Sequence, residues 1–154
     1  MPVPDRGPPV KFDHIGELSG FVNHSPHRVL YRNKMYPTAM HLLEAMKFTE
    51  HPELQERIRT CTDVGDMYPL SASFQDRVRP DWGLVFLKIM EDVLYLKFKQ
   101  HPHLRSLLLR THLADIVYAD PNLYWGQGPS GEGSNELGRA LMRIRDRLHA
   151  DGET

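Results

Sequence analysis

Apolar residues recur at helical spacing in several segments of the chain, most clearly in residues 80–100. There they return every three or four positions and form one broad face, made of Val85, Phe86, Ile89, Met90, Val93, Leu94 and Leu96. Pro80 at the first position and Asp81 in the first turn are typical of a helix start. Because His101-Pro102 interrupts the pattern, we expect the longest helix of the protein to end there.

Four shorter helices are also expected. Pro37-Thr38 begins one that continues to about Phe48, and His51-Pro52 separates it from a helix over residues 53–59. Another covers residues 102–109. The last begins near Asn135, with an apolar face of Leu137, Leu141, Ile144 and Leu148 and a solvated face of Arg139, Arg143, Arg145 and Arg147.

Two short segments favour β-structure. Residues 28–36 carry β-branched and aromatic side chains around Asn33-Lys34, which is typical of a short hairpin. Residues 115–118 are expected to form a short strand. The sequence therefore predicts an α+β fold, a single helix-dominated domain with a small antiparallel sheet over residues 11–149. Residues 1–10 are expected to be a disordered leader and residues 150–154 a frayed tail.

Composition and charge exclude several classes of protein. The 154 residues are 40% hydrophobic, and 19 Lys and Arg against 20 Asp and Glu argue against a polybasic nucleic-acid surface, although they are compatible with a local basic pocket. The single cysteine, Cys61, cannot form an internal disulfide, and the proline-rich start lacks the apolar run of a signal peptide or membrane anchor. We expect a cytoplasmic protein.

The nine histidines do not predict a metal centre. His101 and His103 have no accompanying group of Cys, Asp or Glu at ligand spacing, and the HExxH motif is absent. The sequence also lacks a Gly-x-Ser-x-Gly elbow and a Walker loop. No metal and no cofactor are expected.

The glycine-rich stretch, residues 125–135 (WGQGPSGEGSN), is the first candidate for ligand binding. Its four glycines let backbone N–H groups approach a ligand, and the helix that follows offers unpaired donors and a positive dipole end, so the stretch suits a phosphate. A glycine-rich surface loop without a ligand, with Asn135 capping the helix, is the alternative. Trp125 and Trp82 offer flat apolar surfaces for a base or a ribose, or pack in the core.

Two further clusters carry charge. Arg77, Arg79 and Asp81 lie just ahead of the longest helix, where arginine forks suit pyrophosphate oxygens unless the segment is a solvated turn. His41, Glu44 and Lys47 follow at spacings of three, so they share one side of a helix. This second cluster is either a catalytic set or a plain exposed pair.

Several short runs in a fixed order resemble the NADAR domain family, also called YbiA-like, over about residues 12–148. They are Tyr36-Pro37-Thr38 with His41, Ala45, Lys47 and Phe48; Arg77 to Trp82; Lys97 to Pro102; Leu107-Leu108; Trp125 to Gly128; and Asn135 to Gly138 with Leu141-Met142. The resemblance implies a mainly helical α+β domain that cleaves N-glycosidic bonds. The family's substrates are ribosylamino-pyrimidine phosphates of riboflavin biosynthesis, or ADP-ribose attached to guanine.

The chain departs from the family pattern at two carboxylate positions. After Tyr-Pro-Thr the family usually has Glu-His and then Gln, whereas this chain has Met40-His41 and then Glu44. Residue 44 lies one helical turn further on, so its carboxylate can reach the same pocket. Before Trp-Gly the family tends to show a glutamate and an aspartate, whereas this chain has Tyr118 and Asn122, with Asp120 nearby.

These observations predict a hydrolase of N-glycosyl compounds that acts on a phosphorylated riboside or an ADP-ribosyl group, free or on nucleic acid. Glu44 is expected to steady the oxocarbenium-like charge and activate water, with Asp81 as second choice and His41 orienting or protonating the substrate. Substrate binding is expected from Tyr36, Lys47, Arg77, Arg79, Trp82, Trp125, Gly126, Gly128 and Asn135. The alternatives are a module that binds ADP-ribose or a related nucleotide without cleaving it, and an interaction domain with a decayed pocket.

Overall fold

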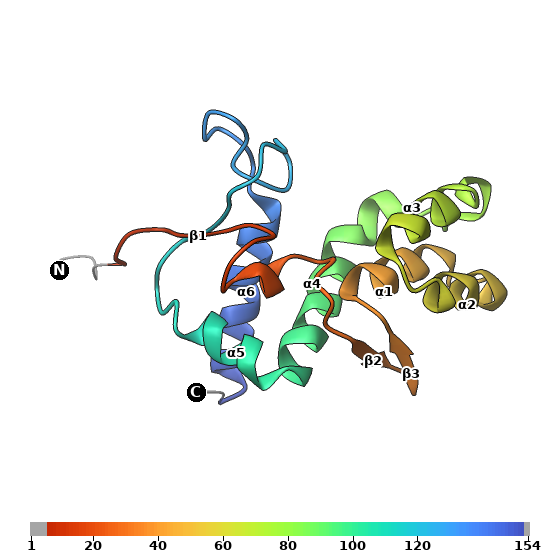
Figure 1. Cartoon of the computed structure of the whole chain (residues 1–154), viewed down its shortest axis with the longest axis horizontal. Helices are drawn as coiled ribbons and strands as arrows, with labels where there is room; N and C mark the ends of the chain where they lie inside the picture. Colours follow the sequence, from red (N-terminus) through yellow and green to blue (C-terminus); the bar gives the residue numbers. More distant parts are fainter. Residues whose placement is uncertain (1–5, 153–154) are drawn as a thin grey trace. The chain divides into compact units, whose positions relative to one another are not determined.

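The computed structural model describes residues 6–152, which divide into two units (Figure 1). The central unit is the continuous segment Asn23–His101. The terminal unit is built from both ends of the chain, up to Val22 and from Pro102 onward. Each unit is described by itself.

The central unit begins with a β-hairpin of β2 (Val29–Tyr31) and β3 (Lys34–Tyr36), in which Val29 lies opposite Tyr36. Arg32 and Asn33 form the turn, with φ angles of 49° and 65°. Two residues of positive φ match the twist of paired antiparallel strands. The expected hairpin is confirmed, with its turn one residue earlier than Asn33-Lys34.

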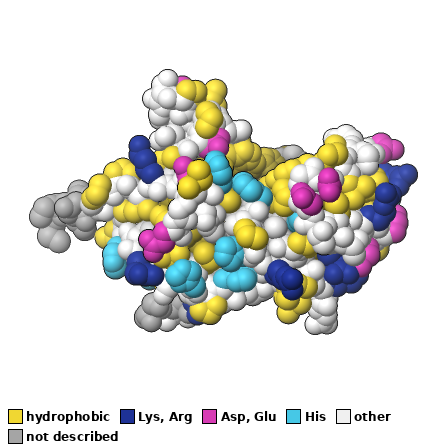
Figure 2. Space-filling view, viewed as in Figure 1, with side chains coloured by type: hydrophobic (Ala, Val, Ile, Leu, Met, Phe, Trp, Pro, Cys, Tyr) yellow, Lys and Arg dark blue, Asp and Glu magenta, His cyan; other side chains and the backbone are white. Residues whose placement is uncertain are grey.

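Helices make up the rest of the central unit: α1 (Ala39–Ala45), α2 (Pro52–Thr60), α3 (Val64–Ala72) and α4 (Trp82–Gln100), with single 3₁₀ turns at η2 (Met46–Phe48) and η3 (Gln75–Arg77). α1 packs against the other three helices. The Thr38 hydroxyl caps α1 by accepting from the His41 backbone N–H at 3.1 Å. Charged side chains of both signs gather over α2 and α3 (Figure 2).

The longest helix differs from the prediction at its start. α4 begins at Trp82, two residues after Pro80, and the Asp81 carboxylate binds Arg79 instead of capping the helix. Its inner face carries the buried residues Met90, Val93, Leu94 and Phe98, and also Lys97, which is fully buried. Val85, Phe86, Ile89 and Leu96 of the predicted face are only partly buried.

The terminal unit contains a pair of strands and two principal helices. β1 (Val10–Phe12) and β4 (Ile116–Tyr118) pair in parallel, and α6 (Glu136–Ala150) packs against β4 and α5 (Pro102–Leu109); a 3₁₀ turn, η1, covers Ser19–Phe21. The parallel pair was not expected from the sequence. β1 begins within the predicted leader, of which residues 1–5 lie outside the described residues, as do residues 153–154 of the predicted tail.

α6 confirms its predicted apolar face, since Leu137, Leu141, Ile144 and Leu148 are buried. Its predicted solvated face is wrong at Arg145, which is 6% exposed. The Arg145 guanidinium donates to the Thr111 hydroxyl at 2.8 Å and to the Ala114 carbonyl at 2.7 Å. These partners lie in the connection before β4, so helical periodicity could not indicate them.

Among residues 6–152, no helix combines the length and apolar character needed to cross a bilayer. The same part of the chain contains no group of three or more His, Cys, Asp or Glu side chains placed to hold a metal ion.

Candidate functional site

Glu44 on α1 is the centre of a small polar cluster in the central unit. One carboxylate oxygen, Oε2, accepts from the Ser71 hydroxyl at 2.7 Å and from the Lys47 ammonium at 2.7 Å. The side chains of Glu44 and Lys47 are 12% and 24% exposed. The cluster is therefore a fixed arrangement at the edge of the core, and the simpler interpretation of residues 44 and 47 as an exposed pair is wrong.

The second carboxylate oxygen of Glu44, Oε1, is open. None of the described residues donates a hydrogen bond to it. No fully buried side-chain oxygen of the described residues lacks a partner, so Oε1 reaches solvent. A carboxylate with one fixed oxygen and one open oxygen can accept a proton from water or face a developing positive charge.

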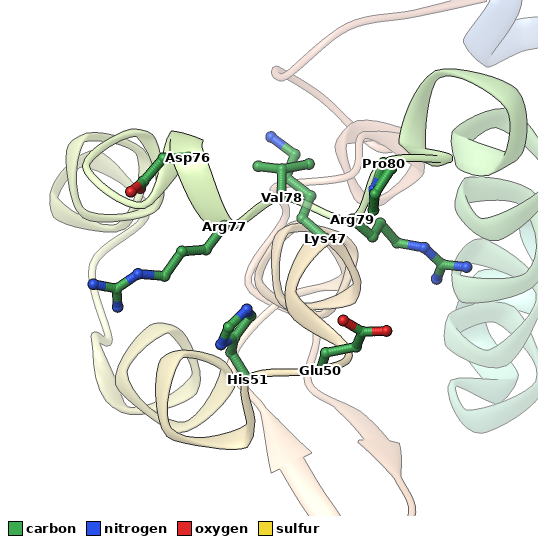
Figure 3. Close-up of a pocket in the computed structure, with 8 residues that line it drawn as sticks. All are labelled: Lys47, Glu50, His51, Asp76, Arg77, Val78, Arg79 and Pro80. Atoms are coloured by element: carbon green, nitrogen blue, oxygen red, sulfur yellow. The ribbon is translucent and has the colours of Figure 1, made fainter.

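Lys47 connects this cluster to the segment before α4. Its ammonium lies 5.9 Å from the centre of the Trp82 ring, and its carbonyl accepts from the Arg79 backbone N–H at 2.8 Å. Beside it is a hollow of about 150 Å³ (Figure 3). The lining residues are Lys47, Glu50, His51, Asp76, Arg77, Val78, Arg79 and Pro80.

The two arginines of this segment differ in their partners and extend to opposite sides of the hollow (Figure 3). The Arg79 guanidinium donates to both oxygens of Asp81, at 2.6 and 2.9 Å. These bonds hold the pKa of Asp81 below its usual value. Arg77 has no side-chain partner within residues 6–152. Arg77 is thus the available cation of this pair, and Asp81 is already occupied by Arg79.

His41 lies in the core rather than in a site. It is fully buried, with Nε2 2.6 Å from the Cys61 carbonyl and Nδ1 2.8 Å from the Thr38 hydroxyl. Because a carbonyl can only accept, Nε2 carries the proton and Nδ1 accepts from Thr38. Burial lowers the pKa of His41, which favours this neutral ring. Both ring nitrogens have partners in the core, so the structure leaves neither of them open to a substrate, and the role of His41 in orienting or protonating the substrate stays a prediction.

Tyr36, the predicted substrate-binding residue at the end of β3, is also buried, at 5% exposed. Burial raises the pKa of its phenol. Its ring is core packing in the central unit. Trp82 remains half-buried at the start of α4, where its ring contacts Phe86.

The glycine-rich stretch belongs to the terminal unit, and its N–H groups at Gly126, Gly128 and residues 133–135 donate to carbonyls of residues 120–127. At the start of α6 the backbone N–H groups of Asn135, Glu136 and Leu137 donate to the carbonyls of Gly126, Tyr124 and Trp125, at 2.9, 3.0 and 3.1 Å. Gly126 and Gly128 are buried, and their N–H groups donate to Asn122 and Asp120 carbonyls. The expectation of unpaired donors at this helix start is therefore wrong.

Asn135 does not cap α6 with its side chain. Its amide donates to the Ile116 carbonyl and accepts from the Tyr118 N–H, both at 2.9 Å, so the side chain ties the loop to β4. A Cβ at Gly126 would lie 2.6 Å from the Asp120 carbonyl oxygen. This close approach of two backbones explains why residue 126 is glycine, and no bound ligand is needed for the explanation.

Two residues at the altered family positions also have local partners. The Asn122 side-chain oxygen accepts from the N–H groups of Tyr124 and Trp125, at 2.9 and 2.8 Å, which an aspartate oxygen could do equally well. Tyr118 stacks on Phe12, with ring centres 5.1 Å apart.

Ser71, the second donor to Glu44, was not predicted from the sequence, because its helix was not expected.

Comparison with known proteins gives the family. A family model described as the NADAR domain matches residues 11–149. The chain belongs to the NADAR family. N-glycosidase YbiA of Escherichia coli strain K12 is 33% identical over 137 residues, which make up 88% of this chain and 83% of that protein. The family inferred from the ordered motifs is confirmed.

A second relative of this NADAR chain is longer. Riboflavin biosynthesis protein VVA0006 of Vibrio vulnificus strain YJ016 is 31% identical over 142 residues, which cover 91% of this chain but 38% of that protein. The solution structure of E. coli YbiA superposes with a TM-score of 0.80 at 29% identity, covering 94% of this chain and 88% of YbiA. The predicted helix-dominated α+β fold is confirmed, with a parallel pair of strands in addition to the antiparallel one that was expected.

Proposed function

We propose that this NADAR protein hydrolyses the N-glycosidic bond of a phosphorylated ribosyl or ADP-ribosyl substrate, and that Glu44 is the carboxylate of the reaction. One observation carries the assignment of Glu44. Its Oε2 is fixed by two donors, 2.7 Å away each, while its Oε1 faces solvent. Glu44 is also one helical turn beyond Met40, at which the family usually has a glutamate.

The reaction class rests on family membership. Relatives that match most of this chain are named N-glycosidase YbiA, and a longer one is named a riboflavin biosynthesis protein. The predicted enzyme class, a hydrolase acting on N-glycosyl compounds, is confirmed at this level. The riboside substrate and its phosphate are our proposal.

In the proposed mechanism the bond between the anomeric carbon and the base nitrogen lengthens first. Positive charge then develops on the anomeric carbon and the ring oxygen, and the Glu44 carboxylate stabilises it. Water adds its oxygen to the anomeric carbon while Glu44 accepts a water proton, and transfer of that proton to the departing nitrogen returns Glu44 to its carboxylate form. General base catalysis of this kind contributes about 10²- to 10⁴-fold to the rate.

Arg77 is the proposed phosphate ligand. Arg77 is one of the residues that line the hollow beside Lys47, and its guanidinium has no partner among the described side chains. A guanidinium fork suits phosphate oxygens. Arg79 and Lys47, which were predicted for the same role, are paired with Asp81 and Glu44, so a phosphate would have to displace a carboxylate from either of them.

Replacing Glu44 tests the proposal. The variant Glu44→Gln keeps the size of the side chain but removes its charge. We expect release of free base from a ribosylamino-pyrimidine phosphate, or from ADP-ribosylated guanine, to fall at least about 100-fold by chromatographic assay. Glu53→Gln, on exposed α2 surface, is the matched control and should keep full activity. An active Glu44→Gln enzyme would remove Glu44 from the mechanism.

A second candidate function is recognition of ADP-ribose without cleavage. It is favoured by Met40, which stands where the family usually has its glutamate, and by the ion pair that already occupies one oxygen of Glu44. Calorimetry with ADP-ribose, run beside the base-release assay, separates the two. Tight binding without release of base from either substrate would select the binding module.

A further inference from the structure

Ser71 joins α3 to the proposed catalytic carboxylate on α1. The side chain is 3% exposed, and its hydroxyl donates to Glu44 Oε2 at 2.7 Å. It lies one residue before the end of α3, a helix that packs against α1. The hydrogen bond therefore connects two helices through residues that are 27 positions apart in sequence.

We propose that Ser71 is a positioning residue for Glu44: together with Lys47 it holds one carboxylate oxygen in place and leaves the other free to act on the substrate. The inference rests on the proposed role of Glu44. It adds a residue to that site for which no motif of the sequence gave an indication.

Lys47 alone would fix the carboxylate poorly. Its ammonium is a point charge on a flexible four-carbon chain, and it can approach a carboxylate from many directions. Ser71 has one side-chain torsion and is buried in a helix, so its hydroxyl has few positions available. Two donors from different elements, converging on the same oxygen, restrict the glutamate far more than either does alone. Placement to within about an ångström is worth up to 10²-fold in rate.

Tyr68, three residues before Ser71 on α3, interacts electrostatically with the same carboxylate. Burial raises the pKa of the Tyr68 phenol, and the negative charge of Glu44 raises it further. Tyr68 is 40% exposed, so its phenol can be titrated in solution. It reports the position of Glu44 whether or not a substrate is present.

The test compares Ser71→Ala with Ser71→Thr, which restores a hydroxyl, and with Ser71→Cys in case threonine does not fit. For base release by Ser71→Ala, we expect kcat to fall about 10- to 100-fold with KM nearly unchanged, and Ser71→Thr to recover most of the loss. Ser73→Ala is the control, since the exposed Ser73 hydroxyl bonds the Leu70 carbonyl and not Glu44. Unchanged kcat in Ser71→Ala, with Glu44→Gln inactive, would overturn the inference alone.

A titration of Tyr68 decides the question independently of activity. In protein carrying ¹³C-labelled tyrosine, Glu44→Gln should lower the Tyr68 pKa because it removes a negative charge. Ser71→Ala should shift that pKa part of the way, as the released carboxylate moves, while Ser71→Thr and Ser73→Ala match the wild type. A Tyr68 titration unchanged in Ser71→Ala would overturn the inference, and active Glu44→Gln enzyme would overturn the proposed function.

Discussion

The glycine-rich stretch and the Glu44 region were both expected to bind substrate, and they differ in what their polar groups contact. At the start of α6 the N–H groups of residues 135–137 donate to carbonyls of residues 124–126. In the Glu44 region, Glu44 Oε1 and the Arg77 guanidinium have no partner within the described chain. A sequence motif names groups that can bind a ligand, but their remaining hydrogen-bonding capacity decides which of them are available.

The glycines of this stretch, like its N–H groups, are used in the fold of the loop itself. Gly126 and Gly133 allow segments of the loop to pass within contact distance of each other, and Gly128 has a φ of +74°. These requirements come from the fold of the loop. The predicted roles of Gly126, Gly128, Asn135 and Trp125 in substrate binding stay predictions, and the structural roles of the first three are sufficient to explain their identity.

The largest expected effect on stability is that of Gly126→Ala. The new Cβ would lie 2.6 Å from the Asp120 carbonyl oxygen, so backbone must shift, and we expect a loss of about 1–3 kcal/mol in the free energy of unfolding. Chemical denaturation measures it. Ser130→Ala, at an exposed position of the same stretch, should stay within about 0.5 kcal/mol of the wild type. Wild-type stability in Gly126→Ala combined with weaker nucleotide binding would restore the ligand-cradle interpretation.

Lys97 represents a third situation, a charged group enclosed in the core of the central unit. Its ammonium donates to the Ser25 hydroxyl at 2.6 Å, and burial lowers its pKa to about 7. Between pH 7 and about 10 the folded protein has released this proton while the unfolded chain, with an ordinary lysine, still holds it. Because the unfolded state binds more protons there, stability rises with pH, by at most about 1.4 kcal/mol per pH unit.

The variant Lys97→Met tests this linkage. Methionine has a similar length and no proton to exchange. We therefore expect the part of the rise in stability between pH 7 and 9 that Lys97 causes to disappear. Denaturation midpoints at several pH values give the slope. Lys88→Met, on the exposed side of the same helix, should retain the wild-type slope. An unaltered slope in Lys97→Met would show that other groups cause the pH dependence.

The features that could be predicted from the sequence are those with a local signal. Thr38 marks the start of α1, residues 29–36 form the hairpin, and the apolar positions of α6 are buried as their spacing indicated. α3 was missed because Gly65 and Pro69 disfavour a helix, and only the structure shows Asp63 capping it by accepting from the Gly65 N–H. Ser71 was missed together with that helix.

Long-range partners explain the other differences. β1 pairs with a strand more than a hundred residues away, and nothing in residues 10–12 specifies a parallel neighbour. Histidine is a residue type often found in catalytic sites, yet the two partners of His41, Thr38 and the Cys61 carbonyl, place it in the core. Helical spacing correctly grouped Glu44 with Lys47, but it could not show that a third residue fixes the same oxygen.

The smallest expected effect on stability, that of Arg77→Ala, tests the comparison most directly. Arg77 is exposed and has no side-chain partner in residues 6–152, so its loss should change the free energy of unfolding by less than about 0.5 kcal/mol. Calorimetry with ADP-ribose should nevertheless show affinity about tenfold lower or more, because a charge-assisted hydrogen bond to phosphate is lost. Arg79→Ala, which breaks the pair with Asp81, should cost more stability than Arg77→Ala. If Arg77→Ala binds as the wild type does, its open guanidinium is a solvated surface group, and an unpaired cation in this region does not mark the phosphate site.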